Sequence, residues 1–109
     1  MDILEHIFKI QEELVGIMDT SKYPDSVEER ISVLMTAIVH ESIELQRLTN
    51  WKWWKKPVEF DKDSAKEELI DIFHFVIQSF IELDMSPEEI LKDYVRKNNI
   101  NRERQMSGY

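Results

Sequence analysis

A chain of 109 residues with a hydrophobic fraction of 42% is long enough for one small domain with a single core, and it is too apolar for a disordered tail. Its net charge of −8 at pH 7 disfavours binding to duplex DNA or to an anionic membrane, since either would need a basic face. Without cysteine there are no disulfides, thiolate metal sites or cysteine nucleophile, and no segment has the length to cross a bilayer, so we expect one cytoplasmic domain over residues 1–109.

The composition predicts an all-α fold, because only two glycines and three prolines interrupt a chain rich in helix formers. The first helix is expected over residues 2–19, where apolar side chains recur at the helical period. Gln11 lies one residue from the apolar face of this helix, and taken alone it is interpreted as an exposed glutamine. Ser26 opens a predicted capping box for the second helix, which is expected to end at about Leu48.

Two pairs of carboxylates stand out at helical spacing. Glu41 and Glu44 share one flank of the second helix, and taken alone they are interpreted as a solvated edge. Glu68 and Asp71 interrupt a third, largely apolar helix, where an ionised carboxylate needs a cation or a metal ion as its partner. Antiparallel packing of the two helices would bring the four carboxylates together, and their all-oxygen ligation suits Mg²⁺, with Mn²⁺ as a substitute.

The third helix is expected over about residues 65–83, after a capping box opened by Ser64. It is apolar almost all round, which predicts a central place in a four-helix bundle. Phe75 and Gln78 share the stripe of the acidic pair. For His74 a role in the core or at a cap is favoured over metal ligation, since no second histidine lies at ligand spacing on this helix.

The connection between the second and third helices, residues 49–63, is rich in tryptophan and lysine over Trp51-Lys-Trp-Trp-Lys-Lys56. Two interpretations remain open. The indoles form a lid over one end of the bundle, or indoles and lysines border a site for a planar or phosphorylated ligand.

The fourth helix is expected to begin after Ser86 and to turn four apolar side chains inward, namely Ile90, Leu91, Tyr94 and Val95. Its later part is basic and rich in amides, and Lys97, Asn101 and Arg104 share one face. These residues are interpreted either as a grip for phosphate groups or as a solvated helix end whose cations suit the helix dipole.

The predicted carboxylate cluster and the cationic face together favour hydrolysis of a phosphoanhydride. Metal ions would stand between carboxylates and the phosphates of a nucleotide, and a carboxylate would take the proton of the attacking water. The chain has neither a Ser-His-Asp set nor a glycine-rich phosphate loop that would favour other chemistry.

The pattern Glu41-x-x-Glu44, a gap of 23 residues and then Glu68-x-x-Asp71 resembles the all-α nucleoside triphosphate pyrophosphatases, which include the MazG-like enzymes. Three further stretches are similar to motifs of the dimeric dUTPases within this group, namely Trp53-Trp54-Lys55, residues 67–75 and residues 94–109.

This resemblance implies an Mg²⁺-dependent dimer, with a tetramer as the alternative, that hydrolyses dUTP or dUDP to dUMP and so keeps uracil out of DNA. It implies a metal site formed by Glu41, Glu44, Glu68 and Asp71, in which Glu41 also activates the water. The expected phosphate-binding residues are Lys97, Asn101, Arg104 and Tyr109. The expected base- and nucleotide-binding residues are Gln11, Trp54, Lys55 and Phe75.

The chain departs from the dimeric dUTPases at its amino-terminal motif. Ile10-Gln11-Glu-Glu-Leu14-Val15 stands where the family has a pattern like Leu-Gln-x-x-Leu-Asn, so the asparagine that helps to read the base is missing. One alternative is therefore a MazG-like pyrophosphohydrolase with a different or broader base preference. The other is a non-catalytic helical interaction module whose tryptophan segment docks a protein.

Overall fold

The computed structural model describes residues 2–108, and within them the all-α prediction is confirmed, since the segment contains helices and no strand. The helices are α1 (Ile3–Ile17), α2 (Val27–Arg47), α3 (Lys62–Glu82) and α4 (Pro87–Met106). In this range each helix is too short or too polar to cross a bilayer.

The helix starts follow side-chain caps. Ser26 and Ser86 each accept a hydrogen bond of 3.1 Å from the amide three residues further on, as predicted for α2 and α4. The predicted start of α3 at Ser64 is wrong, because Asp61 is the cap. The Asp61 carboxylate accepts hydrogen bonds from both the amide and the hydroxyl of Ser64, at 3.1 Å and 2.7 Å, so α3 begins at Lys62.

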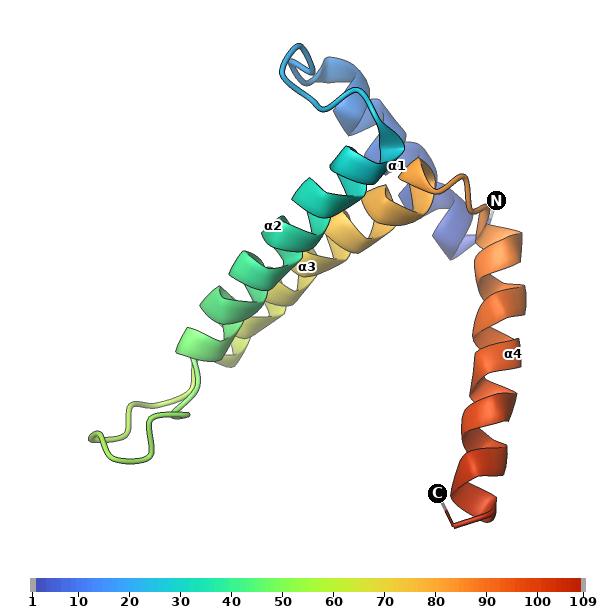
Figure 1. Cartoon of the computed structure of the whole chain (residues 1–109). Coiled ribbons are helices and arrows are strands. Elements are labelled where there is room, and N and C mark those ends of the chain that lie inside the picture. The colour runs from blue at the N-terminus through green and yellow to red at the C-terminus, as the bar shows by residue number, and fades with distance from the viewer. Residues whose placement is uncertain (1, 109) are drawn as a thin grey trace.

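The helices α2 and α3 form an antiparallel pair that runs side by side over most of its length (Figure 1). Helix α1 packs across α3 near the carboxyl end of α3. The buried apolar residues of the described chain are one from each of these helices, namely Phe8, Leu34 and Ile77. The core therefore lies where α1, α2 and α3 meet.

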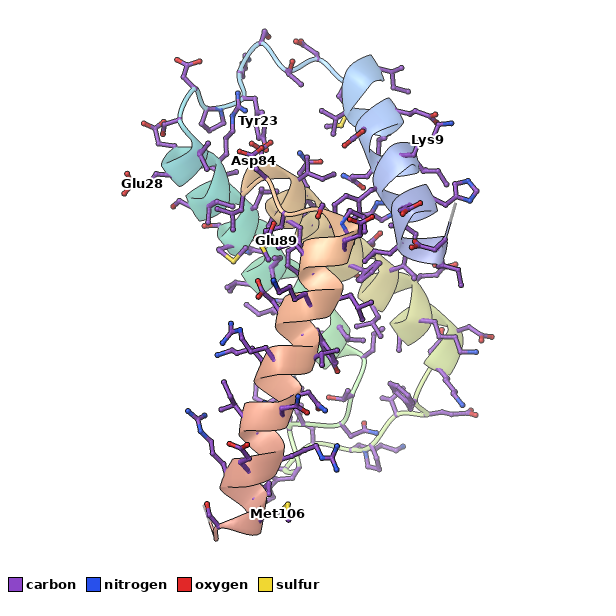
Figure 2. All side chains as sticks on the ribbon, turned by 90° about the vertical axis from the view of Figure 1, so that its right-hand side faces the viewer. Lys9, Tyr23, Glu28, Asp84, Glu89 and Met106 are labelled. Carbon is purple, nitrogen blue, oxygen red and sulfur yellow. The ribbon has the colours of Figure 1, made fainter. Side chains whose placement is uncertain are left out.

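Helix α4 stands apart from the α2–α3 pair (Figure 1). Its backbone approaches α1, but within the described residues no Cα of α4 comes within 8 Å of α2 or α3. Side chains project into open space along most of this helix (Figure 2). Leu91, Tyr94 and Val95 are exposed and Ile90 is half-buried, so the prediction that these side chains point inward is wrong for the first three in the single chain, because no other described segment covers this face.

Candidate functional site

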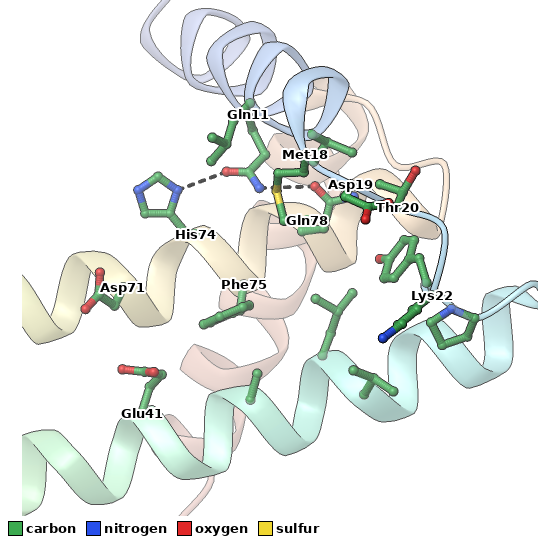
Figure 3. A pocket seen from close by; sticks show the side chains of 17 residues that line it. Gln11, Met18, Asp19, Thr20, Lys22, Glu41, Asp71, His74, Phe75 and Gln78 are labelled. Atoms are coloured by element: carbon green, nitrogen blue, oxygen red, sulfur yellow. Dashed lines mark hydrogen bonds between the residues drawn. The ribbon is translucent and has the colours of Figure 1, made fainter.

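A pocket of about 800 Å³ opens between α1, α2 and α3 (Figure 3). The middle of the pocket is lined largely by apolar side chains, including Phe75 from α3 and Leu34 from α2. Glu41 and Asp71 lie on facing helices at one end, and Gln11 lies on the side formed by α1, where it meets His74 and Gln78 of α3. Such a pocket suits a ligand with an apolar ring and polar groups at its edges.

Three carboxylates gather beside the acidic end of this pocket. Glu41, Glu44 and Glu68 each offer an oxygen atom, and these oxygens all lie within 4.8 Å of one another. The antiparallel packing of α2 and α3 thus brings together three of the four carboxylates that the sequence pairs predict. Asp71, the fourth carboxylate, lies outside this group of three. It lies on α3 at the same end of the pocket as Glu41, which faces it from α2.

Among these carboxylates, the crowding affects Glu68 most clearly. Its Oε2 atom is buried and has no hydrogen-bond partner among the described residues. Burial raises the pKa of Glu68 above its ordinary value, and the charge of Glu44, a hydrogen bond with Glu41 and the charges of Glu41 and Asp71 raise it further. A divalent cation with hard-ligand preference would satisfy the orphaned oxygen and offset the repulsion, so this donor set fits Mg²⁺ or Mn²⁺.

Gln11 is buried at the other side of the pocket, with only 7% of its surface exposed, so its interpretation as an exposed glutamine is wrong. Its Oε1 lies 3.0 Å from His74 Nδ1, and its Nε2 donates to Gln78 Oε1 at 3.1 Å (Figure 3). Gln78 Nε2 in turn donates to Glu82 Oε1 at 3.0 Å. His74 thus serves as a hydrogen-bonding partner and is not part of the carboxylate group.

Glu82 ends this chain of hydrogen bonds and is held from two further sides. Arg30 pairs with its Oε2 at 3.2 Å, and the Tyr23 hydroxyl donates to its Oε1 at 3.0 Å. The Arg30 guanidinium also lies 4.7 Å from the centre of the Tyr23 ring. Burial raises the pKa of Tyr23, and the hydrogen bond to Glu82 and the charge of Glu82 act in the same direction.

The tryptophan segment lies outside the pocket, beyond the carboxyl end of α2. Asn50 fixes its ends by bonding both backbone polar groups of Val58, at 2.8 Å and 2.9 Å. The indoles pack edge to face on one another, and in the single chain each stays at least 46% exposed. Neither Trp54 nor Lys55 lines the pocket, and Lys55 instead borders a separate hollow together with Trp51.

The predicted phosphate-binding residues lie on α4, away from the pocket in the single chain. Lys97, Asn101 and Arg104 are exposed, and α4 does not approach the helices that carry the carboxylates. Tyr109 lies outside the described residues.

Sequence reasoning missed the partners of Gln11. The sequence places Gln78 on the stripe of Asp71 and Phe75, but it does not show that this stripe meets Gln11 on α1. Tyr23 and Glu82 carried no such signal, because their hydrogen bond joins residues 59 positions apart and one of them lies in a connection.

The chain was compared with known proteins. A family model described as dUTPase matches residues 3–89 and 78–109. The dCTP pyrophosphatase of Enterobacteria phage T4 is 37% identical over 98 residues, which is 78% of this chain and 57% of that protein. The dCTP pyrophosphatase of Enterobacteria phage LZ5 is 36% identical over an alignment of 121 positions, covering 84% of this chain and 70% of that protein.

A protein of Enterobacteria phage T4 named DNA replication protein is 34% identical over 87 residues, 68% of this chain and 22% of its own length. The chain thus spans less than two thirds of both phage T4 relatives. No solved structure matches it.

Proposed function

The chain belongs to the dUTPase family, and from that premise we propose that it hydrolyses a pyrimidine deoxynucleoside triphosphate to the monophosphate and pyrophosphate, with dUTP as the first candidate substrate. The observation that carries this proposal is a group of three carboxylates beside one end of a pocket that is also lined, on its α1 side, by a buried glutamine. The diphosphate dUDP, with phosphate as its second product, is the related substrate.

The lining of the pocket favours one orientation of the nucleotide. Its volume of about 800 Å³ lies within the range of small-molecule sites, and its apolar middle would hold the base, with the Phe75 ring as a contact. Gln11 would hydrogen-bond the edge of the base, because its amide still has one donor and one acceptor position to offer. The phosphates would then extend toward Glu41 and Asp71.

Glu41, Glu44 and Glu68 would hold Mg²⁺, with Asp71 close enough to add its charge to the site. Mg²⁺, or Mn²⁺ in its place, would supply Lewis acidity and neutralise charge on the phosphate oxygens. Glu41 belongs to the cluster and also lines the pocket, so its carboxylate is the group placed to accept the proton of the attacking water. These roles would explain why the protein keeps carboxylates so close together, although in the absence of metal they repel one another.

The second candidate substrate is dCTP, and the two phage relatives named dCTP pyrophosphatases favour it. A glutamine amide carries both a donor and an acceptor, so it is able to pair with uracil or with cytosine. The asparagine missing from the amino-terminal motif leaves this choice to Gln11 and its neighbours.

A second copy of the chain would complete the phosphate end. Helix α4 carries Lys97, Asn101 and Arg104 away from the carboxylates of its own chain and exposes an apolar face. In a homodimer, or a tetramer built from such pairs, α4 would pack on the partner and place these residues near the partner's phosphates. Trp54 and Lys55 would border the nucleotide in the same way.

A substrate panel tests the proposal. Purified protein is incubated separately with dUTP, dCTP, dUDP and the remaining deoxynucleoside triphosphates, with Mg²⁺ and with EDTA. We expect pyrophosphate release from dUTP or dCTP that needs the metal. Hydrolysis of none of these nucleotides would overturn the proposal, and similar rates for purine and pyrimidine substrates would favour the MazG-like alternative.

Variants separate catalysis from the interaction-module alternative. Glu68→Gln should lower kcat by about a hundredfold or more, and Asp71→Asn should also lower it, because each removes a charge from the metal site. Glu67→Gln is the matched control, since it makes the same change one residue from Glu68, on an exposed side chain outside the cluster. Full activity in all three variants would contradict the metal site.

A further inference from the structure

We propose that Glu82, acting through Gln78, is a positioning residue that fixes the orientation of the Gln11 amide and thereby sets the choice between uracil and cytosine. This inference rests on the proposed function in one respect, namely that Gln11 faces the base. The side chains of Glu82, Gln78, Gln11 and His74 are joined by a chain of hydrogen bonds, which we call the relay.

The relay has a fixed polarity. A carboxylate paired with a guanidinium has only acceptor oxygens, so Gln78 must turn its Nε2 toward Glu82, at 3.0 Å. Its Oε1 then faces Gln11, which must present Nε2 as the donor, at 3.1 Å. One carboxylate on α3 therefore dictates the orientation of an amide on α1, although it does not touch that amide.

The far end of the relay is His74. Since Gln11 Oε1 is able only to accept, the His74 Nδ1 atom 3.0 Å away must carry the hydrogen. The relay thus selects the tautomer in which a neutral His74 is protonated at Nδ1. This tautomer is an observable consequence that needs no substrate.

The orientation of this amide matters because uracil and cytosine present opposite hydrogen-bonding patterns. Uracil has an acceptor at the 4-position and a donor at N3, whereas cytosine has a donor at the 4-position and an acceptor at N3. For a base held in one orientation by the pocket, turning the Gln11 amide over exchanges its donor with its acceptor. A site with fixed buried polar groups rejects the base that leaves them unpaired.

The surroundings of Glu82 show why it is able to act as a fixed end. Its side chain is 10% exposed, Arg30 and Tyr23 bind its two oxygens, and Gln78 is 7% exposed. Neither Glu82 nor Arg30 lines the pocket, so they have no direct route to a ligand there. The carboxylate group at Glu41, Glu44 and Glu68 is separate and does not include Glu82.

The kinetic test uses Glu82→Gln, which keeps the shape of the side chain and makes the polarity of the relay ambiguous. We divide kcat/KM for the preferred substrate, dUTP or dCTP, by kcat/KM for the other one. In this variant we expect the resulting ratio to fall toward one, by at least tenfold, and mainly through a change in KM. Gln78→Met cuts the relay without touching the Arg30–Glu82 pair and should have the same effect. If the ratio is unchanged in both variants, the proposal is wrong.

Arg30→Lys is the matched control, because it removes the guanidinium contacts with Glu82, Pro24 and Tyr23 but keeps a cation beside the Glu82 carboxylate, which is still able only to accept hydrogen bonds. It should lower the melting temperature and keep the dUTP/dCTP ratio within about twofold of the wild type. A collapse of the ratio in Arg30→Lys equal to that in Glu82→Gln would show a merely structural role and would overturn the proposal.

An NMR measurement tests the relay independently of activity. In ¹⁵N-histidine-labelled wild-type protein above the histidine titration range, the His74 resonances should report protonation at Nδ1, and Glu82→Gln should shift the population toward the other tautomer. A wild-type His74 protonated at Nε2 would overturn the relay. If no deoxynucleotide is hydrolysed, the proposed function fails, and the tautomer alone then decides whether the relay exists.

Discussion

At the scale of the residue, Glu68 should link folding to the proposed metal binding. Its Oε2 atom is buried and has no hydrogen-bond partner in residues 2–108, and burial and three neighbouring carboxylates raise its pKa above the ordinary value of 4.5. The folded protein without metal therefore binds this proton more tightly than the unfolded chain does. The resulting stabilisation is fully present below pH 4.5 and is lost as the pH rises through the raised pKa.

Glu68→Gln removes this titration and the repulsion that accompanies it. In EDTA, the free energy of unfolding of the wild type should fall relative to that of the variant as the pH rises from about 4 to about 8. Denaturant unfolding at several pH values measures the difference. Glu67→Gln, which lies outside the cluster, should follow the wild-type profile, and a constant difference between the wild type and Glu68→Gln would contradict the prediction.

Mg²⁺ should reverse the order of stability. Binding to the folded state alone stabilises the wild type by about 2.7 kcal/mol when the free ion is at about 100 times its Kd. Glu68→Gln lacks one of the ligands, so its melting temperature should respond much less. Thermal unfolding over an Mg²⁺ titration measures this, and an equal shift in both proteins would place the ion elsewhere.

The sequence predicted much of this site at the level of single residues. Paired carboxylates at helical spacing are visible in one dimension, and α2 and α3 bring three of the four together. The burial of Gln11 was not visible, because it depends on how α1 crosses α3. The same holds for the Arg30–Glu82 ion pair, whose members lie 52 positions apart and come together only when α2 and α3 pack.

At the scale of the element, local signals placed the helices well. Ser26 and Ser86 cap α2 and α4 as predicted, since serine hydroxyls satisfy amides that the helix leaves unpaired. The start of α3 was misplaced because Asp61 caps the helix three residues earlier, where it accepts hydrogen bonds from both the amide and the hydroxyl of Ser64. The apolar period of α4 predicted a buried face, but the period does not say which chain buries it.

Helix α1 offers a direct test of helix propensity. Gly16 lies in its last turn and is not part of the pocket, and apart from its chain neighbours and the nearby helix backbone no described atom lies within 4 Å of an added Cβ. Gly16→Ala should raise the free energy of unfolding by about 0.5–1 kcal/mol, because alanine loses less backbone entropy in a helix. Denaturant unfolding measures the gain, and kcat should not change. A loss of stability would mean that another chain packs closely on this position.

At the scale of the whole molecule, the single chain is more open than a compact domain of its length. Its radius of gyration is 17.5 Å, whereas a compact domain of this length has about 13 Å. The exposed large apolar residues include Leu91, Tyr94 and Val95 on α4 and Leu69, Ile70 and Phe73 on α3. Exposed apolar patches of this kind are typical of interfaces between protein chains, which agrees with the proposed assembly.

A change on the apolar face of α4 should therefore shift the assembly state. Leu91→Glu places a charge on this face and should weaken association by at least about tenfold, since burying an unpaired charge costs several kcal/mol. Lys92→Gln is the matched control, because it lowers the net charge by the same amount at an exposed position further round the helix. Sedimentation velocity over a concentration series measures the oligomer, and a wild-type monomer at all concentrations would contradict the interface.

Complementation decides whether the two halves of the site come from different chains. Glu68→Gln removes a carboxylate and Lys97→Ala a cation, so each variant alone should lose about a hundredfold in kcat. If α4 acts on the partner's substrate, a mixed dimer has one site with both groups intact, and random mixing should restore about a quarter of the wild-type activity. If α4 acts within its own chain, every site in the mixture lacks one group, and mixing restores nothing. Refolding the two variants together from denaturant and assaying pyrophosphate release distinguishes these outcomes, with each variant refolded alone as the control.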